Sequence, residues 1–211
     1  MRRYQGWLIT CLLALIIVIP IIHYRATYAT YRRLRVVTPG KLYRSGQLTI
    51  QGFRDAIDRY GIKTILNVQD DFPDPLVQSG YRSTVYVHES LMCDQLGVQF
   101  RSIAPGLISP ADIPKHRPKG IDDFLQIMDD PSVYPVLIHC KAGLHRTGLL
   151  CAIYRMEYEH WSLAEAVREL RAHGFGDSAC TTANHYLIQY LSIYRPRWQT
   201  TTAQPHSTNR N

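Results

Sequence analysis

Hydrophobic side chains are most concentrated near the N-terminus of the chain. Residues 4–24 include no Asp, Glu, Lys or Arg, and residues 8–22 are mostly Leu, Ile, Val and Ala. At a rise of about 1.5 Å per residue, a helix of this length crosses a hydrocarbon core of about 30 Å. Trp7 and Tyr24 stand near its two ends, where membrane interfaces favour aromatic rings. We therefore expect residues 1–25 to form an uncleaved transmembrane anchor.

A cleaved signal peptide is the competing interpretation, with Arg2 and Arg3 as its basic region. Against it, the apolar run is long and no clean Ala-x-Ala cleavage site follows. Orientation is more evenly balanced, because basic residues flank both ends. Those on the C-terminal side are Arg25, Arg32, Arg33 and Arg35. This larger cluster favours a single-pass protein with its domain on the cytoplasmic side, whereas the N-terminal pair favours the opposite orientation.

Beyond this segment, short apolar runs alternate with stretches of helical periodicity. The apolar runs predict strands over residues 42–47, 62–68, 98–103 and 136–138. The periodic stretches predict helices over residues 49–60, 86–96, 120–128, 146–160, 163–174 and 182–194. This alternation predicts an α/β fold with a central, mostly parallel sheet of about four to five strands flanked by helices.

Domain boundaries follow from the same pattern. A Thr-Pro-Gly turn signal at residues 38–40 precedes the first strand. We expect a basic linker over residues 26–38 and one globular domain over residues 39–197. The Thr-, Asn- and Gln-rich residues 198–211 are expected to be a disordered tail.

Charge and cysteine content narrow the function classes. The net charge of +7 is concentrated beside the apolar segment, and no zinc finger or basic-aromatic run indicates nucleic-acid binding. The five cysteines are an odd, scattered set, which makes a disulfide framework or a paired-cysteine zinc site a poor interpretation. We expect free thiols, no metal and no cofactor.

The candidate chemistry lies where the strand at residues 136–138 runs into His139 and Cys140. Five loop residues then lead into a helix that begins near Arg146. A helix N-terminus offers unpaired N–H groups and a partial positive charge, and Gly143 allows the loop to curve tightly. Such a loop cradles a phosphate, and Arg146 can bind two of its oxygens in a fork.

The same surroundings favour a negatively charged sulfur at the centre of the loop. We therefore expect Cys140 to be a thiolate at neutral pH. A thiolate at the base of a phosphate cradle can attack phosphorus and form a phosphocysteine intermediate. The hydroxyl of Thr147 can donate to this sulfur and help it leave in the second step.

Residues 139–148 read His-Cys-Lys-Ala-Gly-Leu-His-Arg-Thr-Gly and match the pattern His-Cys-x-x-Gly-x-x-Arg-Thr-Gly at every fixed position. The pattern resembles the protein tyrosine phosphatase superfamily, and residues 42–47 and the Lys-Ala-Gly interior look like its dual-specificity branch. The resemblance implies that Cys140 is the nucleophile, Arg146 the phosphate clamp and His139 the residue that orients the loop. The implied substrate-binding residues are Lys141, Ala142, Gly143, Leu144, His145 and Arg146. Rhodanese-type sulfur transferases also use a cysteine loop, but they do not account for this pattern.

The resemblance also implies an aspartate that serves as general acid, on a loop roughly thirty residues before the cysteine. Asp112 lies in a proline-rich loop 28 residues before Cys140 and fits this position. Asp70 and Asp71, in a loop after a strand, are alternatives. Asp122 and Asp123 begin the next helix and are expected to be surface carboxylates.

The resulting hypothesis is a phosphatase that removes phosphate from tyrosine, and also from serine and threonine, in proteins. The alternative substrate is a phosphoinositide or inositol polyphosphate, because Lys141 and His145 would add cationic groups at the pocket mouth beside a membrane. A hypothesis of another class is a membrane-held, phosphate-binding pseudophosphatase, although the presence of both Cys140 and Arg146 counts against it. The expected partners are a phosphorylated protein or phosphoinositide and, through the N-terminal helix, the membrane, with no nucleic acid.

Overall fold

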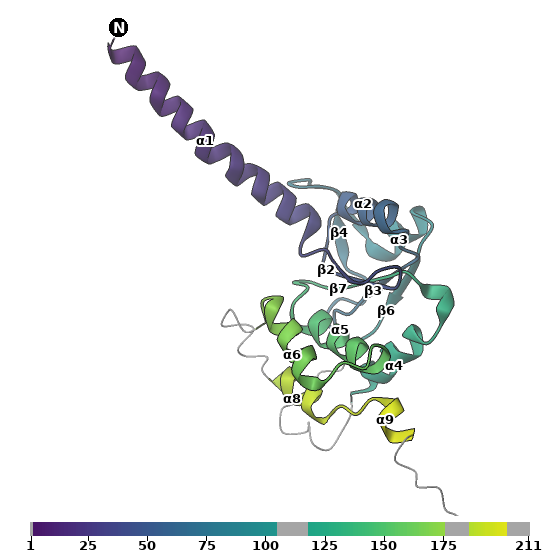
Figure 1. The fold of residues 1–211 in the computed structure, drawn as a ribbon. Helices are drawn as coiled ribbons and strands as arrows, with labels where there is room; N and C mark the ends of the chain where they lie inside the picture. The colour runs from purple at the N-terminus through teal and green to yellow at the C-terminus, as the bar shows by residue number, and fades with distance from the viewer. Residues whose placement is uncertain (1, 105–117, 176–185, 202–211) are drawn as a thin grey trace, which may run out of the picture.

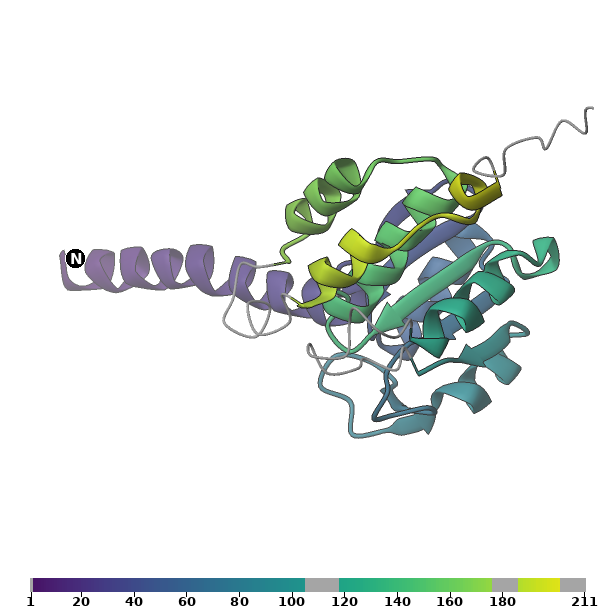
Figure 2. The same ribbon diagram turned by 90° about the horizontal axis from the view of Figure 1, so that it is seen from below.

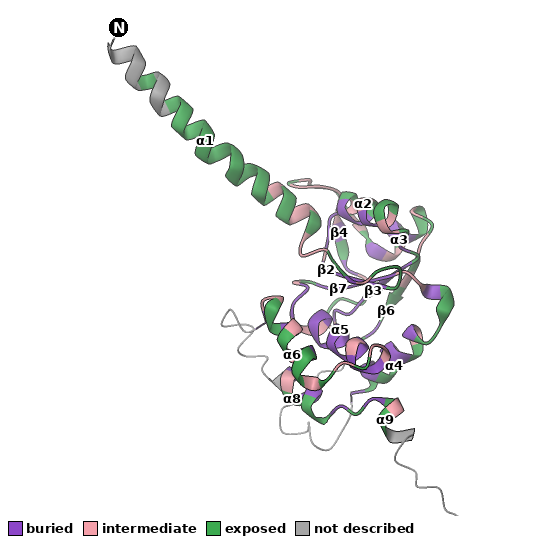
Figure 3. Cartoon of the chain, in the orientation of Figure 1, coloured by how far each residue is buried: buried purple, intermediate pink, exposed green. Residues whose placement is uncertain are grey.

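The computed structural model describes residues 2–104, 118–175 and 186–201. A long helix, α1 (Arg2–Tyr31), projects from a compact α/β body (Figure 1). Residues 11–31 of α1 form a segment long and apolar enough to cross a membrane, and most of these residues are exposed (Figure 3). The last turn of α1 instead contacts the domain, since the Tyr31 hydroxyl donates a hydrogen bond to the Asp55 carboxylate.

The central sheet contains five strands in the order β1-β2-β7-β3-β6. These strands are β1 (Arg35–Thr38), β2 (Leu42–Gly46), β7 (Val136–Cys140), β3 (Thr64–Asn67) and β6 (Gln99–Ser102). β1 pairs with β2 in antiparallel fashion and the other pairs are parallel. The predicted fold class, a mostly parallel sheet of this size flanked by helices, is confirmed.

Helices cover both faces of the sheet (Figure 1, Figure 2). On one face lie α2 (Ile50–Tyr60) and α3 (Glu89–Gln95), and on the other lie α4 (Lys119–Met128), α5 (His145–Tyr158), α6 (Leu163–Ala172) and α8 (Tyr186–Ile193). Each face has its own core, one centred on Phe53 of α2 and the other on Phe124 of α4 and Leu150 of α5. Both cores meet β7, which therefore carries the loop that follows Cys140 out of the buried centre of the domain.

The region expected to be a linker differs from the prediction. Residues 26–31 complete α1, and residues 35–38 form β1, whose Val37 is only 6% exposed. Burial of Val37 and pairing with β2 make this basic segment part of the fold. The sheet therefore begins at Arg35 rather than after residue 38.

The helix expected over residues 86–96 is wrong in its first turn. Residues 86–88 form β5 (Tyr86–His88), which pairs with β4 (Leu76–Gln78) in a separate two-stranded sheet. The helix begins only at Glu89, where the Asp74 carboxylate accepts hydrogen bonds from the backbone N–H (2.9 Å) and the hydroxyl (2.7 Å) of Ser90. The aromatic and β-branched pair Tyr86-Val87 suits a strand better than a helix.

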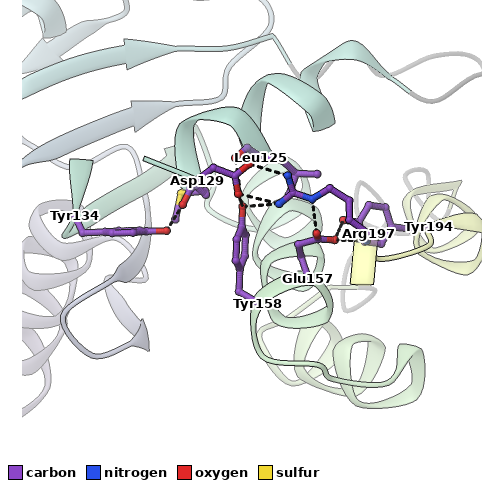
Figure 4. A network of polar contacts seen from close by, with 8 residues as sticks. Leu125, Asp129, Tyr134, Glu157, Tyr158, Tyr194 and Arg197 are labelled. Carbon is purple, nitrogen blue, oxygen red and sulfur yellow. Dashed lines mark hydrogen bonds and ion pairs between the residues drawn. The ribbon is translucent and has the colours of Figure 1, made fainter. Parts of the chain in front are cut away.

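The C-terminal boundary also extends further than expected. After the 3₁₀ turn η1 (Pro131–Val133) and the helices above, the described chain ends with α9 (Arg197–Thr201). Arg197 binds Asp129 through two nitrogens at 2.7 and 2.8 Å and also reaches Glu157 (Figure 4). Trp198 donates to the Met156 carbonyl at 3.1 Å. Residues 198–201 of the expected tail are therefore helical, and its remaining residues lie outside the described chain.

Candidate active site

The loop from Cys140 to His145 joins the end of β7 to the start of α5. In the sheet, Cys140 pairs with Gly46 of β2. Gly143 has φ +72°, and a Cβ on it would lie 2.4 Å from the Gly46 nitrogen. A glycine is therefore required for the loop to fold back over β2. In this conformation the Gly143 N–H donates to the Cys140 sulfur at 3.2 Å.

Cys140 is 4% exposed and lies at the base of this loop. Thr147 is fully buried, and its hydroxyl has no hydrogen-bond partner within the described residues. The predicted hydrogen bond from Thr147 to the sulfur is thus not formed in this structure. The sulfur instead accepts a hydrogen bond from the backbone N–H of Gly143.

His139 is held by a residue that the sequence reasoning missed. Its Nε2 lies 2.6 Å from the Glu89 carboxylate, and both side chains are fully buried. The ring also meets the edge of Phe53, with centroids 5.4 Å apart. Together the two contacts fix the imidazole orientation one residue before Cys140. The sequence alone does not pair His139 with Glu89, because Glu89 is fifty positions away, on α3.

Arg146 points toward the acidic loop after β3. Its Nε lies 2.9 Å from Asp70 Oδ2, and its Nη2 lies 3.6 Å from Asp71 Oδ2. The structure therefore brings the two alternative aspartates, Asp70 and Asp71, to Arg146.

The other aspartates named from the sequence, Asp112, Asp122 and Asp123, are not placed at Arg146 by the described residues. Asp112 lies outside the described residues, which stop at 104 and resume at 118. Asp123 pairs with Lys119 one turn away on α4, as expected of a surface carboxylate. Asp122 lies in the first turn of the same helix.

The rim of the loop carries Lys141 and His145, which differ in charge. Lys141 is exposed and lines two cavities, of about 270 Å³ and about 430 Å³. His145 is partly buried, and burial lowers its pKa, with the guanidinium groups of Arg146 and Arg33 lowering it further. The lowered pKa favours the neutral form of His145 at pH 7, which leaves Lys141 as the cationic group of the two.

Two further arginines contact the outer side of the loop. Arg33 Nη1 donates to the Ala142 carbonyl at 3.0 Å, and Arg44 Nη2 donates to the Gly143 carbonyl at 2.9 Å. Arg44 is only 3% exposed. Neither residue was predicted as part of the site, although Arg44 lies in the segment whose resemblance was noted.

The comparisons with known proteins agree with this arrangement. The sequence model of the tyrosine phosphatase family matches residues 34–195. The dual specificity protein phosphatase TpbA of Pseudomonas aeruginosa is 49% identical over 43 residues, 20% of each chain. Inositol diphosphatase DSP3 of Arabidopsis thaliana is 37% identical over 65 residues, which make up 30% of this chain and 32% of that protein. The alignments thus span only a fifth to a third of these relatives' lengths.

Among solved structures, the core catalytic domain of the PP-IP phosphatase Siw14 from S. cerevisiae, in complex with citrate, has a TM-score of 0.57. The alignment covers 82% of this chain and 92% of that chain at 23% identity, which shows a shared fold. The family match includes every element from β1 to α8 and the whole phosphate loop. The chain therefore belongs to the tyrosine phosphatase family, in the dual-specificity-like branch of the cysteine phosphatases.

Proposed function

We propose that this cysteine phosphatase hydrolyses phosphotyrosine in proteins, with phosphoserine and phosphothreonine as further substrates, and that Cys140 is its nucleophile. The observation that carries the proposal is the position of the Cys140 sulfur. It lies at the base of a loop whose Gly143 amide points at it, with Arg146 in the first turn of the following helix. A dianionic phosphate seated on these donors places phosphorus within reach of the sulfur.

The reaction proceeds in two displacements. In the first, the Cys140 thiolate attacks phosphorus, the bond to the substrate oxygen breaks, and that oxygen receives a proton from a carboxylic acid. In the second, water attacks the phosphocysteine, the carboxylate accepts the water proton, and the thiolate leaves. Arg146 holds two phosphate oxygens through both steps. We propose Asp112 as the acid, with Asp70 as the rival because it lies beside Arg146.

A phosphotyrosyl peptide assay with the full chain in detergent tests this proposal. Wild-type protein should release phosphate, and Cys140→Ser should abolish turnover because a serine hydroxyl is a far weaker nucleophile than a thiolate near neutral pH. The serine variant should still bind vanadate, since the loop amides and Arg146 remain. A wild-type protein that binds vanadate yet hydrolyses neither peptide nor a generic aryl phosphate would instead identify a pseudophosphatase.

A second candidate substrate is a phosphoinositide or inositol polyphosphate. The cavity of about 270 Å³ beside the loop is lined by two cations, Arg32 and Lys141, and by the amides of Gln47 and Gln78. Such a lining suits additional phosphate groups on one substrate. Comparing kcat/KM for phosphopeptides, soluble inositol polyphosphates and phosphoinositides in vesicles distinguishes the two classes.

We also propose that residues 1–25 remain as a membrane anchor with the domain on the cytoplasmic side. The exposed apolar surface of α1 supports the anchor, and the arginines after it support the orientation. Resistance of the protein to alkaline carbonate extraction, with the domain accessible to protease only after cell lysis, is the expected result. Release of a soluble, shortened chain would indicate a cleaved signal peptide.

A further inference from the structure

The turn that follows α1 lies against the outer side of the phosphate loop. The Arg32 carbonyl accepts a hydrogen bond from the Gly46 N–H at 2.7 Å. Gly46 is the sheet neighbour of Cys140, and a Cβ on it would come within 2.7 Å of the Arg32 side chain and 3.0 Å of Ala142. The segment between helix and domain is therefore packed into the wall of the site.

Arg33 reaches the loop from this turn. Its backbone has φ +55°, a left-handed conformation that reverses the chain after α1. Its guanidinium donates to the Ala142 carbonyl at 3.0 Å and lies 5.5 Å from the centre of the Tyr28 ring. Tyr28, on the last turns of α1, thus supports one side of the guanidinium while the carbonyl binds it on another.

The peptide unit that Arg33 binds is the one that faces the nucleophile. The Ala142 carbonyl and the Gly143 N–H belong to a single planar peptide and point in opposite directions. The carbonyl accepts from Arg33 and the N–H donates to the Cys140 sulfur at 3.2 Å. A cation on the carbonyl fixes the peptide plane and polarises the N–H toward the sulfur, because linked hydrogen bonds strengthen one another.

We propose that Arg33 is a positioning residue for the phosphatase reaction. It acts through the Ala142–Gly143 peptide, holding the amide toward the sulfur of the free enzyme and toward the phosphate of the bound substrate. The inference rests on the proposed role of Cys140. It also means that the segment leaving the N-terminal helix completes the catalytic loop rather than merely connecting to the domain.

Other charged and ionisable groups around the sulfur are left in place when Arg33 is replaced. They come from the loop, from α3 and β7, from β2, and from α5 with the loop after β3: Lys141, His145, Glu89, His139, Arg44, Arg146, Cys151, Asp70 and Asp71. Because Arg33 also helps to lower the pKa of His145, after burial and Arg146, each Arg33 variant is compared in a His145→Gln background as well.

The test uses the full chain in detergent with Arg33→Ala, Arg33→Met and Arg33→Lys. Methionine keeps a long apolar stem beside Tyr28 but cannot donate a hydrogen bond, and lysine restores the charge and one donor. Arg35→Ala is the matched control, since it removes an exposed arginine two positions away on β1. Two quantities are measured: steady-state kinetics on an aryl phosphate, and the rate at which iodoacetamide alkylates Cys140 as a function of pH.

We expect Arg33→Ala and Arg33→Met to lower kcat/KM by about tenfold, mostly through kcat. Alkylation of Cys140 in these two variants should be slower than in wild type at the acid end of the profile, because a hydrogen bond to the charged sulfur is weakened. Arg33→Lys should recover part of both effects, and Arg35→Ala should stay within about twofold of wild type.

Matching values for the Arg33 variants and Arg35→Ala in both measurements would overturn the inference. If the alanine variant fails to fold, as judged by thermal unfolding, the methionine variant decides in the same way. A wild-type chain that hydrolyses no phosphate ester contradicts the proposed function, whereas the alkylation profiles still report whether Arg33 acts on the sulfur. The two failures are therefore distinguishable.

Discussion

At the scale of single residues, the ion pair between Arg146 and Asp70 bears directly on the proposed phosphate site. The guanidinium Nε lies 2.9 Å from the carboxylate, and both side chains are 24% exposed. If Arg146 is the proposed phosphate clamp, a bound phosphate displaces this carboxylate to receive the arginine fork. We therefore expect Asp70 to weaken anion binding in the free enzyme.

Replacing each aspartate by asparagine separates these roles. If Asp112 is the acid, Asp112→Asn should lower kcat by about 10² to 10⁴ and remove the alkaline decline of the pH profile, because the acid must be protonated to act. Asp70→Asn should tighten vanadate inhibition about fivefold, as expected for the loss of a competing, partly exposed ion pair. The reverse pattern, with kcat collapsing only in Asp70→Asn, would assign proton transfer to Asp70.

Most of the site residues predicted from the sequence are neighbours in it. Cys140, Gly143 and Arg146 belong to one strand-loop-helix transition, so their proposed roles could be argued from local physics. Glu89, which the sequence did not indicate, and Asp70, which it offered only as an alternative acid, reach the site from other elements. Their partners are set by how the sheet brings α3 and the β3 loop to one edge, which no local pattern reveals.

At the scale of elements, helix ends with strong local signals were predicted well and short strands poorly. Thr49 caps α2 by accepting from the Gly52 N–H, Gly61 ends it at φ +63°, and Ser162 with Glu165 forms the predicted capping box of α6. β1, β4 and β5 have at most four residues each and mix polar with apolar side chains. Each pairs with a strand nearby in the chain, β1 with β2 and β4 with β5, but the strands are too short and too mixed in composition for propensity alone to identify them.

α9 is attached to the domain by Arg197, which gives a testable contribution to stability. Arg197→Ala leaves Glu157, whose side chain is 4% exposed, without its guanidinium partner (Figure 4). We expect a loss of about 2 kcal/mol of unfolding free energy at pH 7. Arg195→Ala is the control, because that side chain bonds the backbone carbonyls of Ser192 and Tyr194. Equal denaturation midpoints for the two variants would contradict the prediction.

The same network predicts the pH dependence of that loss. The hydrogen bond from Arg197 lowers the pKa of Asp129. Burial raises the pKa of Glu157, but hydrogen bonds from Arg197 and Tyr194 outweigh burial and leave it lowered. A lowered folded-state pKa contributes stability above the unfolded value of about 4 and loses it as pH falls through the folded value. The difference between wild type and Arg197→Ala should therefore shrink in urea titrations below about pH 4.

At the scale of the whole molecule, the N-terminal helix and the domain share a segment rather than meeting at a flexible joint. Tyr31 bonds Asp55 of α2, and the Thr30 carbonyl approaches Gly52 so closely that a Cβ there would lie 2.0 Å away. Arg33 then contacts the loop and β1 joins the sheet. The boundary predicted from composition, between residues 38 and 39, separates this shared segment from the domain to which it belongs.

Three truncated chains test how the shared segment divides between stability and catalysis. Residues 25–211 keep Tyr28, Arg33 and β1, residues 34–211 keep β1 but lose Arg33, and residues 39–211 lose both. Removing β1 exposes the edge of β2 and takes Val37 out of the core, so the shortest chain should unfold about 5 to 10 °C lower. The first two should have similar Tm values, yet the second should show the reduced kcat/KM of Arg33→Ala.

Equal Tm values for all three chains would mean that β1 contributes nothing to the stability of the fold. Equal kcat/KM for residues 25–211 and residues 34–211 would mean that Arg33 and the end of α1 contribute nothing to catalysis.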